Sequence, residues 1–313
     1  MAKAEAVSRL EALEEVALRR ERGLWSDAFR RLIRNRLSMA ALILLAILAA
    51  LVVLGNYTDV VQRYDPRVQD RSATQEGPSL DHFFGTDQLG RDNWARVLQG
   101  IWISLQVGLG VQAIVLAIGL LVGGIAALGG RLLDNLMMRL TDLGFAFPDL
   151  LFIILIRAVL FGRDWPILGE PVPQMIFAIA FVNWVIISRL VRGQMLSLAE
   201  RDYVMAARAM GSTQTRIVFQ HMLPNALGPV IVAVVFGIPL AIFAEAVLGF
   251  IGIGVPPPTA SLGKLVSDGY SFIQVNVWVV LFPAAAIGLL MLCFTFVGDG
   301  LRDALDPRAA REV

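Results

Sequence analysis

Hydrophobic residues along this chain are gathered into long blocks, separated by shorter polar segments. The blocks are six apolar runs of about 20 residues, a length that crosses about 30 Å of hydrocarbon. They cover 38–55, 104–128, 143–162, 174–191, 226–249 and 275–297. Because hydrocarbon offers no partner to backbone N–H and C=O groups, each run is predicted to be helical. The pattern predicts an all-α integral membrane protein with six transmembrane helices.

The polar segments between the runs differ in charge, and this difference predicts the orientation. Most of the 27 Lys and Arg residues fall in segments that share one side with the N-terminus. Cytoplasmic loops are the basic ones, so both termini are predicted to be cytoplasmic. The predicted segments are a tail and elbow at 1–37, a first transmembrane helix at 38–55, an extracytoplasmic loop at 56–103, a five-helix core at 104–300 with a cytoplasmic loop at 192–225, and a cytoplasmic tail at 301–313.

The charged N-terminal segment is predicted to stay on the cytoplasmic side. Residues 1–23 favour a solvated helix or a frayed tail. Residues 24–37 place four arginines beside aromatic and aliphatic residues, which suits an elbow helix on the lipid surface. The first apolar run starts too late and is too long for a signal peptide. It is therefore predicted to be retained as a transmembrane helix.

Composition excludes several functional classes. The single cysteine, Cys293, excludes an internal disulfide. The two histidines, His82 and His221, are far apart and have no Cys, Asp or Glu at metal-ligand spacing, so no metal site is predicted. A net charge of +1 gives no reason to expect a nucleic-acid partner. An intramembrane protease would need a nucleophile with a base, and no histidine lies in an apolar run.

The loop at 192–225 is too long to be a simple connection, and its sequence predicts two short helices. Asp202 is placed to cap the first of them. Gly211 sits where a helix C-terminus requires a positive φ. Ser212 is expected to cap the second helix, which is predicted to stop at Pro224.

The first of these helices has a face of small side chains. Tyr203, Ala206, Ala207 and Met210 follow the spacing of residues that share one side of a helix. A short helix with such a face is suited to docking into a groove on another protein. Packing against the rest of its own chain explains the same pattern, and the residues alone leave both interpretations open.

The spacing in this loop resembles the EAA loop of ABC importer permeases. The positions that match in register are Ala206, Ala207, Gly211, Leu223 and Pro224. Met205 replaces the Glu of the family pattern and His221 replaces its Ile, and both departures resemble the peptide-type subfamily. The resemblance implies a coupling helix that docks into an ATPase subunit. The residues it assigns to this role are Tyr203, Ala206, Ala207, Arg208, Met210, Gly211, His221, Leu223 and Pro224.

Two further stretches are similar to the peptide and nickel branch of the family. The stretch from Phe84 to Asp92 resembles its GTDxxGRD signature, and the one from Phe243 to Pro258 resembles its AExxLxFLGLGxxPP signature. The first signature supplies Gly85, Thr86, Asp87, Gly90, Arg91 and Asp92. Local chemistry already explains these residues, because Asp and Gly form turns and Asp92 can cap the following helix. A structural role is therefore favoured over contact with substrate.

Polar residues inside apolar runs are candidates for the translocation path or a gate. These are Glu245, Asn183 and Arg157. Ionisable groups within a membrane face protein or a water-filled cavity. Glu245 and Arg157 are expected to neutralise each other or a partner. A purely structural contact between helices remains the alternative.

Taken together, the motifs resemble the C-type permease subunit of bacterial dipeptide and oligopeptide importers. The resemblance implies a type I ABC importer (MetI-like) core with an extra N-terminal helix, in the inner membrane. It implies no catalytic site or cofactor in this chain, with ATP and Mg²⁺ bound by partner ATPases. A second permease in a heterodimer, two ATPase subunits and an extracytoplasmic solute-binding protein complete the expected importer.

The substrate and the energy source have alternatives. The same subfamily handles nickel, glutathione or oligosaccharides in some members. An ion-driven secondary transporter is the alternative from another class, with Glu245 as its candidate carboxylate. No internal repeat is visible in the sequence, which weighs against the inverted-repeat transporters.

Overall fold

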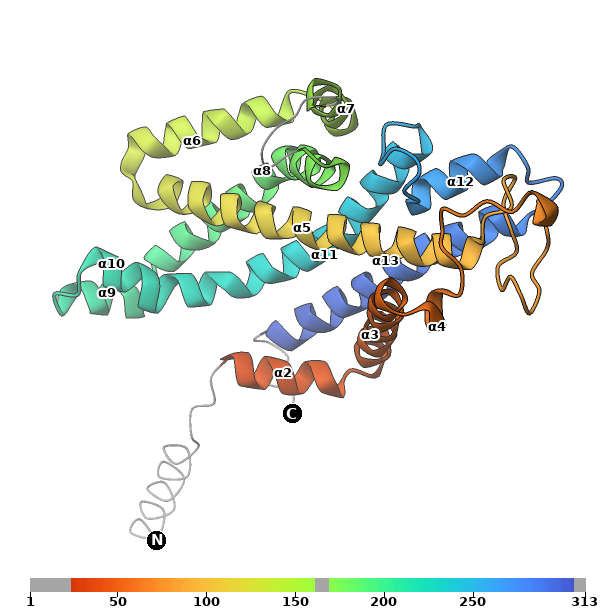
Figure 1. Ribbon diagram of the computed structural model, residues 1–313. Helices are drawn as coiled ribbons and strands as arrows, with labels where there is room; N and C mark the ends of the chain where they lie inside the picture. The colour runs from red at the N-terminus through yellow and green to blue at the C-terminus, as the bar shows by residue number, and fades with distance from the viewer. Residues whose placement is uncertain (1–23, 161–168, 307–313) are drawn as a thin grey trace, which may run out of the picture.

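The computed structural model describes residues 24–160 and 169–306. Within these ranges the chain is helical apart from its loops and has no β-sheet (Figure 1). The helices are α2 (Leu24–Arg34), α3 (Arg36–Tyr57), α4 (Asp59–Gln62), α5 (Asn93–Leu128), α6 (Gly130–Phe145), α7 (Asp149–Leu160), α8 (Pro171–Ala199), α9 (Asp202–Ala209), α10 (Gln214–Ile217), α11 (Leu223–Phe250), α12 (Leu262–Tyr270) and α13 (Trp278–Leu305). The predictions for 1–23 and for the end of the C-terminal tail, 307–313, lie outside the described residues.

Five of the described helices are long and apolar enough to cross a bilayer. They are α3, α5, α8, α13 and the continuous helix Gln214–Phe250. A sixth crossing results if α6 and α7 together form one bent span. The predicted all-α membrane fold is confirmed. The predicted ends are less accurate, because α5 begins at Asn93 rather than 104 and α13 continues to Leu305 rather than 297.

The prediction that 143–162 forms one straight transmembrane helix is wrong. Helices α6 and α7 meet at an angle of 90°, and the break between them falls inside the apolar run. Pro148 stands at this break, just before α7. A proline has no N–H and disfavours helical geometry in the residue before it, so the run cannot continue as one helix.

The gap between the second and third apolar runs, 129–142, implies a loop, but the chain is helical there from Gly130 onward, as the first part of α6. Two acidic residues of this segment pair with arginines of α8. Asp134 accepts hydrogen bonds from Arg192, and Asp142 accepts one from Arg189 at 2.5 Å. Ion pairs of this kind allow a charged helix to pack along an apolar neighbour, which hydropathy alone does not reveal.

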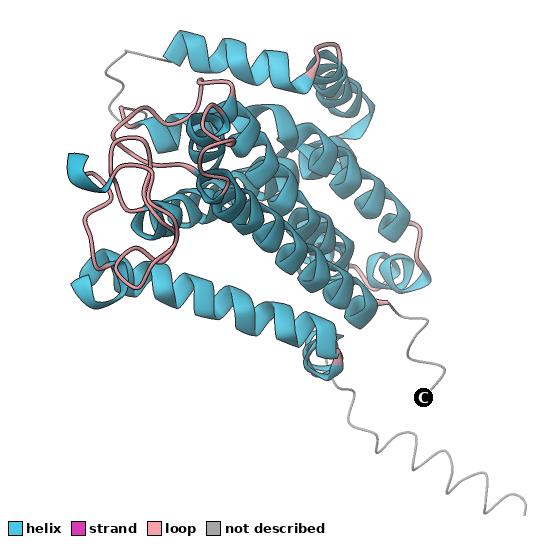
Figure 2. Ribbon diagram, turned by 90° about the vertical axis from the view of Figure 1, so that its right-hand side faces the viewer, coloured by secondary structure: helices cyan, strands magenta, loops and turns pink. Residues whose placement is uncertain are grey.

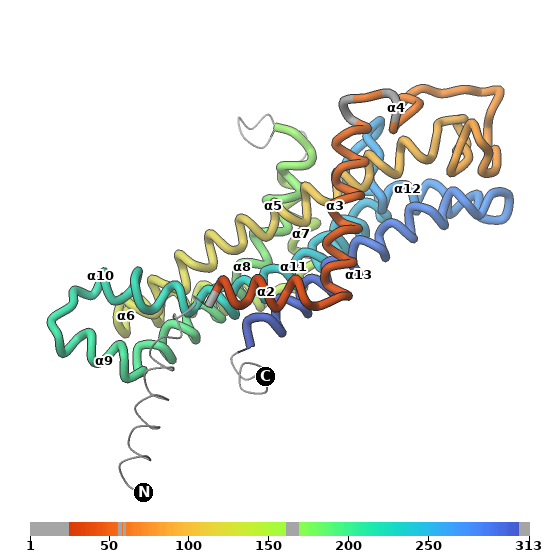
Figure 3. The backbone as a smooth tube through the Cα atoms, turned by 90° about the horizontal axis from the view of Figure 1, so that it is seen from below, coloured from red at the N-terminus to blue at the C-terminus, as the bar shows by residue number. Residues whose placement is uncertain are grey.

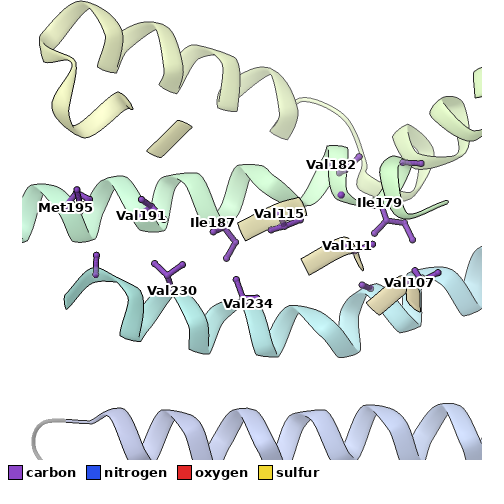
Figure 4. Packing of buried hydrophobic residues seen from close by; sticks show 14 of the residues in the cluster. Val107, Val111, Val115, Ile179, Val182, Ile187, Val191, Met195, Val230 and Val234 are labelled. Atoms are coloured by element: carbon purple, nitrogen blue, oxygen red, sulfur yellow. The ribbon is translucent and has the colours of Figure 1, made fainter. Parts of the chain in front are cut away.

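The centre of the molecule is the contact between α5, α8 and α11. Valine and isoleucine side chains from the three helices point toward one another in Figure 4. Val107, Val111 and Val115 on α5 are buried, as are Ile179 on α8 and Val230 on α11. β-Branched side chains have few rotamers, so they lose little freedom in such a core.

A second cluster attaches the N-terminal helices to this centre. Val52 on α3 is buried with Leu98 on α5, Leu262 on α12 and Leu290 on α13. Near its start, α3 is also held by the Ser38 hydroxyl, which donates to the carbonyl of Phe296 at 2.8 Å. The first transmembrane helix is therefore packed on α13 rather than standing apart.

Helix α2 is amphipathic, as expected for the elbow. Trp25, Phe29 and Ile33 follow at intervals of four residues, and all three are exposed. Arg31 reaches the last turn of α13 and donates to the carbonyl of Asp306 at 3.3 Å. The helix is thus fixed to the protein while its aromatic side remains uncovered, and its position at a lipid surface stays a prediction.

The two ends of the molecule are built differently. Helices α9 and α10 project at one end, and the loop 63–92 lies at the other beside α12 (Figures 1 and 3). Figure 2 shows the loops gathered at this second end. We refer to these as the α9 end and the α12 end. Helices α8 and α11 begin or finish at the α9 end, and so their motion is tied to that of α9.

Substitution of Gly123 tests the close approach of α5 to α8. A Cβ at this position would lie 2.7 Å from the Cβ of Val191, whereas one at Gly124 meets nothing within 4 Å. We expect Gly123→Ala to destabilise the chain by roughly 1–3 kcal/mol through overpacking. Gly124→Ala is the matched control and is expected to be neutral or slightly stabilising. Thermal unfolding of both variants in detergent measures the difference; equal midpoints would contradict this account of the α5–α8 contact.

Candidate functional site

The predicted docking segment forms the tip of the α9 end. Helix α9 starts after Arg201, which occupies the N-cap position without a side-chain hydrogen bond. The prediction that Asp202 is the cap is therefore wrong by one residue. Asp202 is instead the first helical residue, where its negative charge still interacts favourably with the helix dipole.

Gly211 ends α9 in the way the sequence predicts. Its φ is +82°, a conformation that side chains with a Cβ rarely adopt. The N–H of Met210 donates to the carbonyl of Ala206, and the N–H of Ser212 donates to the carbonyl of Ala207, both at 3.0 Å. These bonds satisfy carbonyls that the end of a helix leaves open. The next cap is Thr213 rather than Ser212, since the Thr213 hydroxyl accepts from the N–H of Arg216.

Pro224 does not stop the second helix, contrary to the prediction. Residues Val218–Met222 form one π-helical turn, and α11 begins directly after it at Leu223. The N–H of Leu223 donates to the carbonyl of Val218, five residues back. This wider turn changes the bonding pattern just where proline removes an N–H donor.

The amide of Asn225 completes this junction. Its Nδ2 donates to the carbonyl of His221 at 2.6 Å and to the hydroxyl of Tyr203 at 3.4 Å. The junction is thus tied to α9. As a result, one continuous helix of 37 residues runs from Gln214 to Phe250.

The exposed surface of α9 differs from the predicted face. Val204 and Ala207 are buried against Ile217 and Val218, so Ala207 does not belong to a free face. Since α9 has only eight residues, its inner side is fully used by this contact. Of the two interpretations left open by the sequence, packing against its own chain holds for Ala207, whereas Met210 is exposed.

The other predicted coupling residues of α9 remain on the surface. Met210 is 80% exposed and Tyr203 is 43% exposed. The exposed residues of this segment include Tyr203, Met205, Ala206, Arg208, Met210, Gly211 and Phe219. His221 and Leu223 are half-buried at the junction, and Pro224 is exposed. An uncovered tip with methionines and aromatic rings is a surface that fits a partner groove.

At the α12 end, Asp87 is the centre of the loop that carries the GTDxxGRD-like stretch. The carboxylate is 3% exposed and accepts from the N–H groups of Leu89 at 2.8 Å and Arg91 at 3.0 Å. It also accepts from the side chains of Arg91, at 2.7 Å, and Arg96. These contacts hold the loop together around Asp87, which agrees with the structural interpretation of this motif.

The other members of the same stretch also hold the loop. Asp92 caps α5 by accepting from the N–H of Ala95 at 2.8 Å, and its second oxygen is 2.8 Å from Nδ1 of His82. Thr86 is fully buried, and its hydroxyl contacts the backbone of Ala73. Gly90 has a φ of +71°, and a Cβ there would overlap the carbonyl oxygen of Asp70.

Sequence reasoning missed the link from this loop to α12. Arg96 is 3.9 Å from Asp268, and Asp268 pairs with Lys264 at 2.8 Å. The available signal was the position of Arg96, one helical turn after Asp92 in the predicted helix. No sequence pattern pointed to Asp268, because its partner is 172 positions away along the chain.

The predicted channel residues do not form one cluster. Glu245 is completely buried in α11, and its Oε2 accepts from the hydroxyl of Ser104 on α5 at 3.1 Å. Arg157 forms no ion pair with Glu245, so the expected mutual neutralisation is wrong; its contacts are with α8 and with the loop after α11. Asn183 donates to Ile179 of its own helix at 2.8 Å. A role in the translocation path stays a prediction for all three.

Comparison with known proteins identifies the family. The family described as "Binding-protein-dependent transport system inner membrane component" matches residues 119–311. The family "N-terminal TM domain of oligopeptide transport permease C" matches residues 23–78. The chain belongs to this permease family. Within it, the N-terminal match places the chain with the C-type subunits of oligopeptide and dipeptide permeases.

Curated relatives align with this permease over nearly their whole length. The oligopeptide transport system permease protein OppC of Bacillus subtilis is 38% identical over 91% of this chain and 90% of its own length. The dipeptide transport system permease protein DppC of Alkalihalophilus pseudofirmus is 41% identical over 91% of this chain and 90% of its own length. Family members are non-catalytic transmembrane subunits of ABC importers in the inner membrane.

Solved structures confirm the fold of the permease core. The inward-facing MetNI methionine ABC transporter matches with a TM-score of 0.55 at 20% identity, over 67% of this chain and 96% of that one. An amino acid ABC transporter with histidines matches with a TM-score of 0.51 at 16% identity, over 66% and 92%. The predicted type I importer core is thereby confirmed.

Asp87 provides a test of the loop at the α12 end. Replacing Asp87 by Asn leaves the side chains of Arg91 and Arg96 buried without their carboxylate. Breaking a buried pair in this way costs about 3–5 kcal/mol. We expect the segment around Asp87 to lose protection from hydrogen exchange in Asp87→Asn. Asp81→Asn, at an exposed position of the same loop, is the control; equal protection in both variants would refute the central role of Asp87.

Proposed function

We propose that this permease forms half of the channel of an ATP-driven importer of di- or oligopeptides, and that α9 couples it to a separate ATPase. The uncovered tip of α9 carries this proposal. Met210 and Phe219 are 80% and 64% exposed in a segment whose other side is fully packed. Met210 directly follows α9 and Phe219 lies in the π-helical turn, while Tyr203 and Met205 are exposed on α9 itself. A group of exposed apolar side chains at the tip of a helical segment favours docking into a groove.

The connection of α9 to the spans supports its role in transmission. One end of α9 follows α8 after two residues, and the other leads through α10 into the 37-residue helix that ends at Phe250. Helices transmit displacement along their axes because their backbone hydrogen bonds resist bending. Movement of α9 by an ATPase therefore moves α8 and α11, which meet α5 at the centre of the molecule.

The remaining components follow from the same proposal. A second permease completes the channel, two ATPase subunits bind ATP and Mg²⁺, and an extracytoplasmic solute-binding protein delivers the substrate. The sequence contains no Gly-x-x-x-x-Gly-Lys-[Ser/Thr] phosphate loop, which supports assigning ATP to the partners. Closure of the ATPase pair then drives alternating access of the spans through α9.

Peptides are proposed as the substrate because two relatives with over 35% identity are named as oligopeptide and dipeptide permeases. Nickel, glutathione and oligosaccharides are the alternatives within the same subfamily. Uptake of a labelled dipeptide into vesicles that contain the complete importer decides between them. Competition by excess unlabelled dipeptide but not by nickel, glutathione or sugar is the expected result.

The orientation of the chain is part of this proposal. With the α9 end in the cytoplasm, most Lys and Arg residues of the loops lie inside, as the positive-inside rule requires. Both termini are then cytoplasmic, and the GTDxxGRD-like loop faces outward.

Labelling of single cysteines tests the orientation. The native Cys293 is buried, so new cysteines at exposed positions give the signal. We expect Thr215→Cys at the α9 end to resist a membrane-impermeant maleimide in intact cells and to react in inverted vesicles. Asp81→Cys at the α12 end is expected to behave in the opposite way. Labelling of Thr215→Cys from outside the cell would disprove the cytoplasmic docking of α9.

Replacement of Gly211 tests the coupling role of α9. Valine disfavours a φ of +82°, at roughly 1–2 kcal/mol for the left-handed conformation, and its side chain also enters the space around the tip. We expect Gly211→Val to reduce peptide uptake about tenfold while the ATPase subunits still hydrolyse ATP, because 1.4 kcal/mol corresponds to a factor of about ten.

Gly193→Val is the control for this change. Gly193 is exposed within α8, has no positive φ, and an added Cβ there meets nothing within 4 Å. Its uptake is expected to equal that of the wild type. Unchanged uptake in Gly211→Val would remove the support for α9 as the coupling element.

A further inference from the structure

A cavity of about 430 Å³ lies at the α12 end, between α7 and the loop that follows α11. Its walls are largely the backbone and apolar side chains of that loop, from Gly249 to Pro257. Among the described lining residues, the charged ones are Arg157 and Lys264. A concave, mostly apolar site with a few polar groups is typical of small-molecule binding, and the volume lies in the usual range of about 300–1,000 Å³.

Arg157 is a buried cation whose partners among the described residues are all neutral. Its side chain lines the cavity, and the residue is 2% exposed. It donates to the side-chain oxygen of Gln174 at 2.9 Å and to the carbonyl of Gly254 at 3.0 Å. Its Nε has no hydrogen-bond partner. No carboxylate of the described residues forms an ion pair with it, and a buried charge without a counter-charge is energetically costly.

Lys264 differs from Arg157 because its charge is paired. Its Nζ is 2.8 Å from Asp268. The positive charge of the cavity is therefore set by Arg157, which is fixed in place between α8 and the loop after α11. The guanidinium keeps N–H groups that its neutral partners do not use.

We propose that this cavity binds the terminal carboxylate of a short peptide, with Arg157 as the residue that holds it. The inference rests on the proposed function, which supplies the peptide. A guanidinium matches a carboxylate in geometry as well as charge, and such charge-assisted hydrogen bonds are stronger than neutral ones. The carboxylate supplies the anion that Arg157 lacks, and the apolar walls accommodate the adjacent side chains.

Direct binding to the membrane complex tests this proposal. The complex of both permeases and the ATPases is purified without the solute-binding protein, so that recognition by that protein does not contribute. The probes are the dipeptide Ala-Ala and its C-terminal amide. We expect the amide to bind the wild-type complex roughly ten- to a hundredfold more weakly, the usual value of one hydrogen bond to a charged group.

Variants assign this preference to Arg157. Arg157→Gln is expected to bind the acid and the amide equally, and Arg157→Lys is expected to keep part of the preference because the charge remains. Arg139→Gln, an exposed site on α6, is the control and keeps the full preference. Because the acid and amide are compared on the wild type first, the test does not depend on the folding of any variant.

Three results would overturn the carboxylate site. Equal binding of acid and amide to the wild type is one, and an undiminished preference in Arg157→Gln is the second. The third result combines two measurements: the second permease is lost from Arg157→Gln preparations, and the wild type shows no preference for the acid over the amide. This result would mean that a residue of the second permease supplies the counter-charge of Arg157. ATPase activity stimulated by the solute-binding protein is measured on the same wild-type complex; its absence would instead count against the proposed function.

Discussion

The close contact between α5, α8 and α11 is the constraint on which the rest of the molecule depends. Valine and isoleucine side chains fill this contact, and Gly123 allows α8 to approach α5. Within a membrane, van der Waals packing of this kind replaces the hydrophobic effect as the force between helices. Because α8 and α11 are fixed here, the short helix between their ends has a defined position.

Charged side chains are paired in most parts of the molecule, and these pairs hold a loop and a helix in place. At the α12 end, Asp87 gathers two arginines and two backbone N–H groups, which fixes the loop in front of α5. Along α6, aspartates pair with arginines of α8 and permit a charged helix to lie on an apolar one. Arg157 stands apart from this pattern, since its hydrogen-bond partners among the described residues are the amide of Gln174 and the backbone carbonyls of Pro171 and Gly254. A buried cation with no anion among the described residues is the kind of group that function explains better than stability.

Much of this architecture could be predicted from the sequence, because length and hydropathy determine which segments can cross a membrane. The helices α3, α8, α11 and α13 follow from their apolar runs, and the positive φ of Gly211 follows from its place after α9. The bend between α6 and α7 was missed because the prediction followed apolar composition and did not use Pro148, the residue in the sequence that marks the break. The sequence could not decide whether Ala207 is buried or exposed, because helical periodicity identifies a face without naming what covers it. The separation of Arg157 from Glu245 depends on tertiary contacts of α8 and the loop after α11, which no local pattern encodes.

The π-helical turn at Val218–Met222 sets the rotational phase between the tip and the span. A π turn contains one residue more than an α turn, and each residue of an α-helix accounts for about 100° of rotation. Everything on the α9 side of this turn is therefore rotated by about that angle relative to α11, compared with a regular helix. The single extra residue determines which way Met210 and Phe219 face while the membrane-spanning part keeps its own packing. One residue gained or lost in this turn thus changes the rotation of the tip about the helix axis. The packing of the membrane-spanning part of α11 is not changed by it.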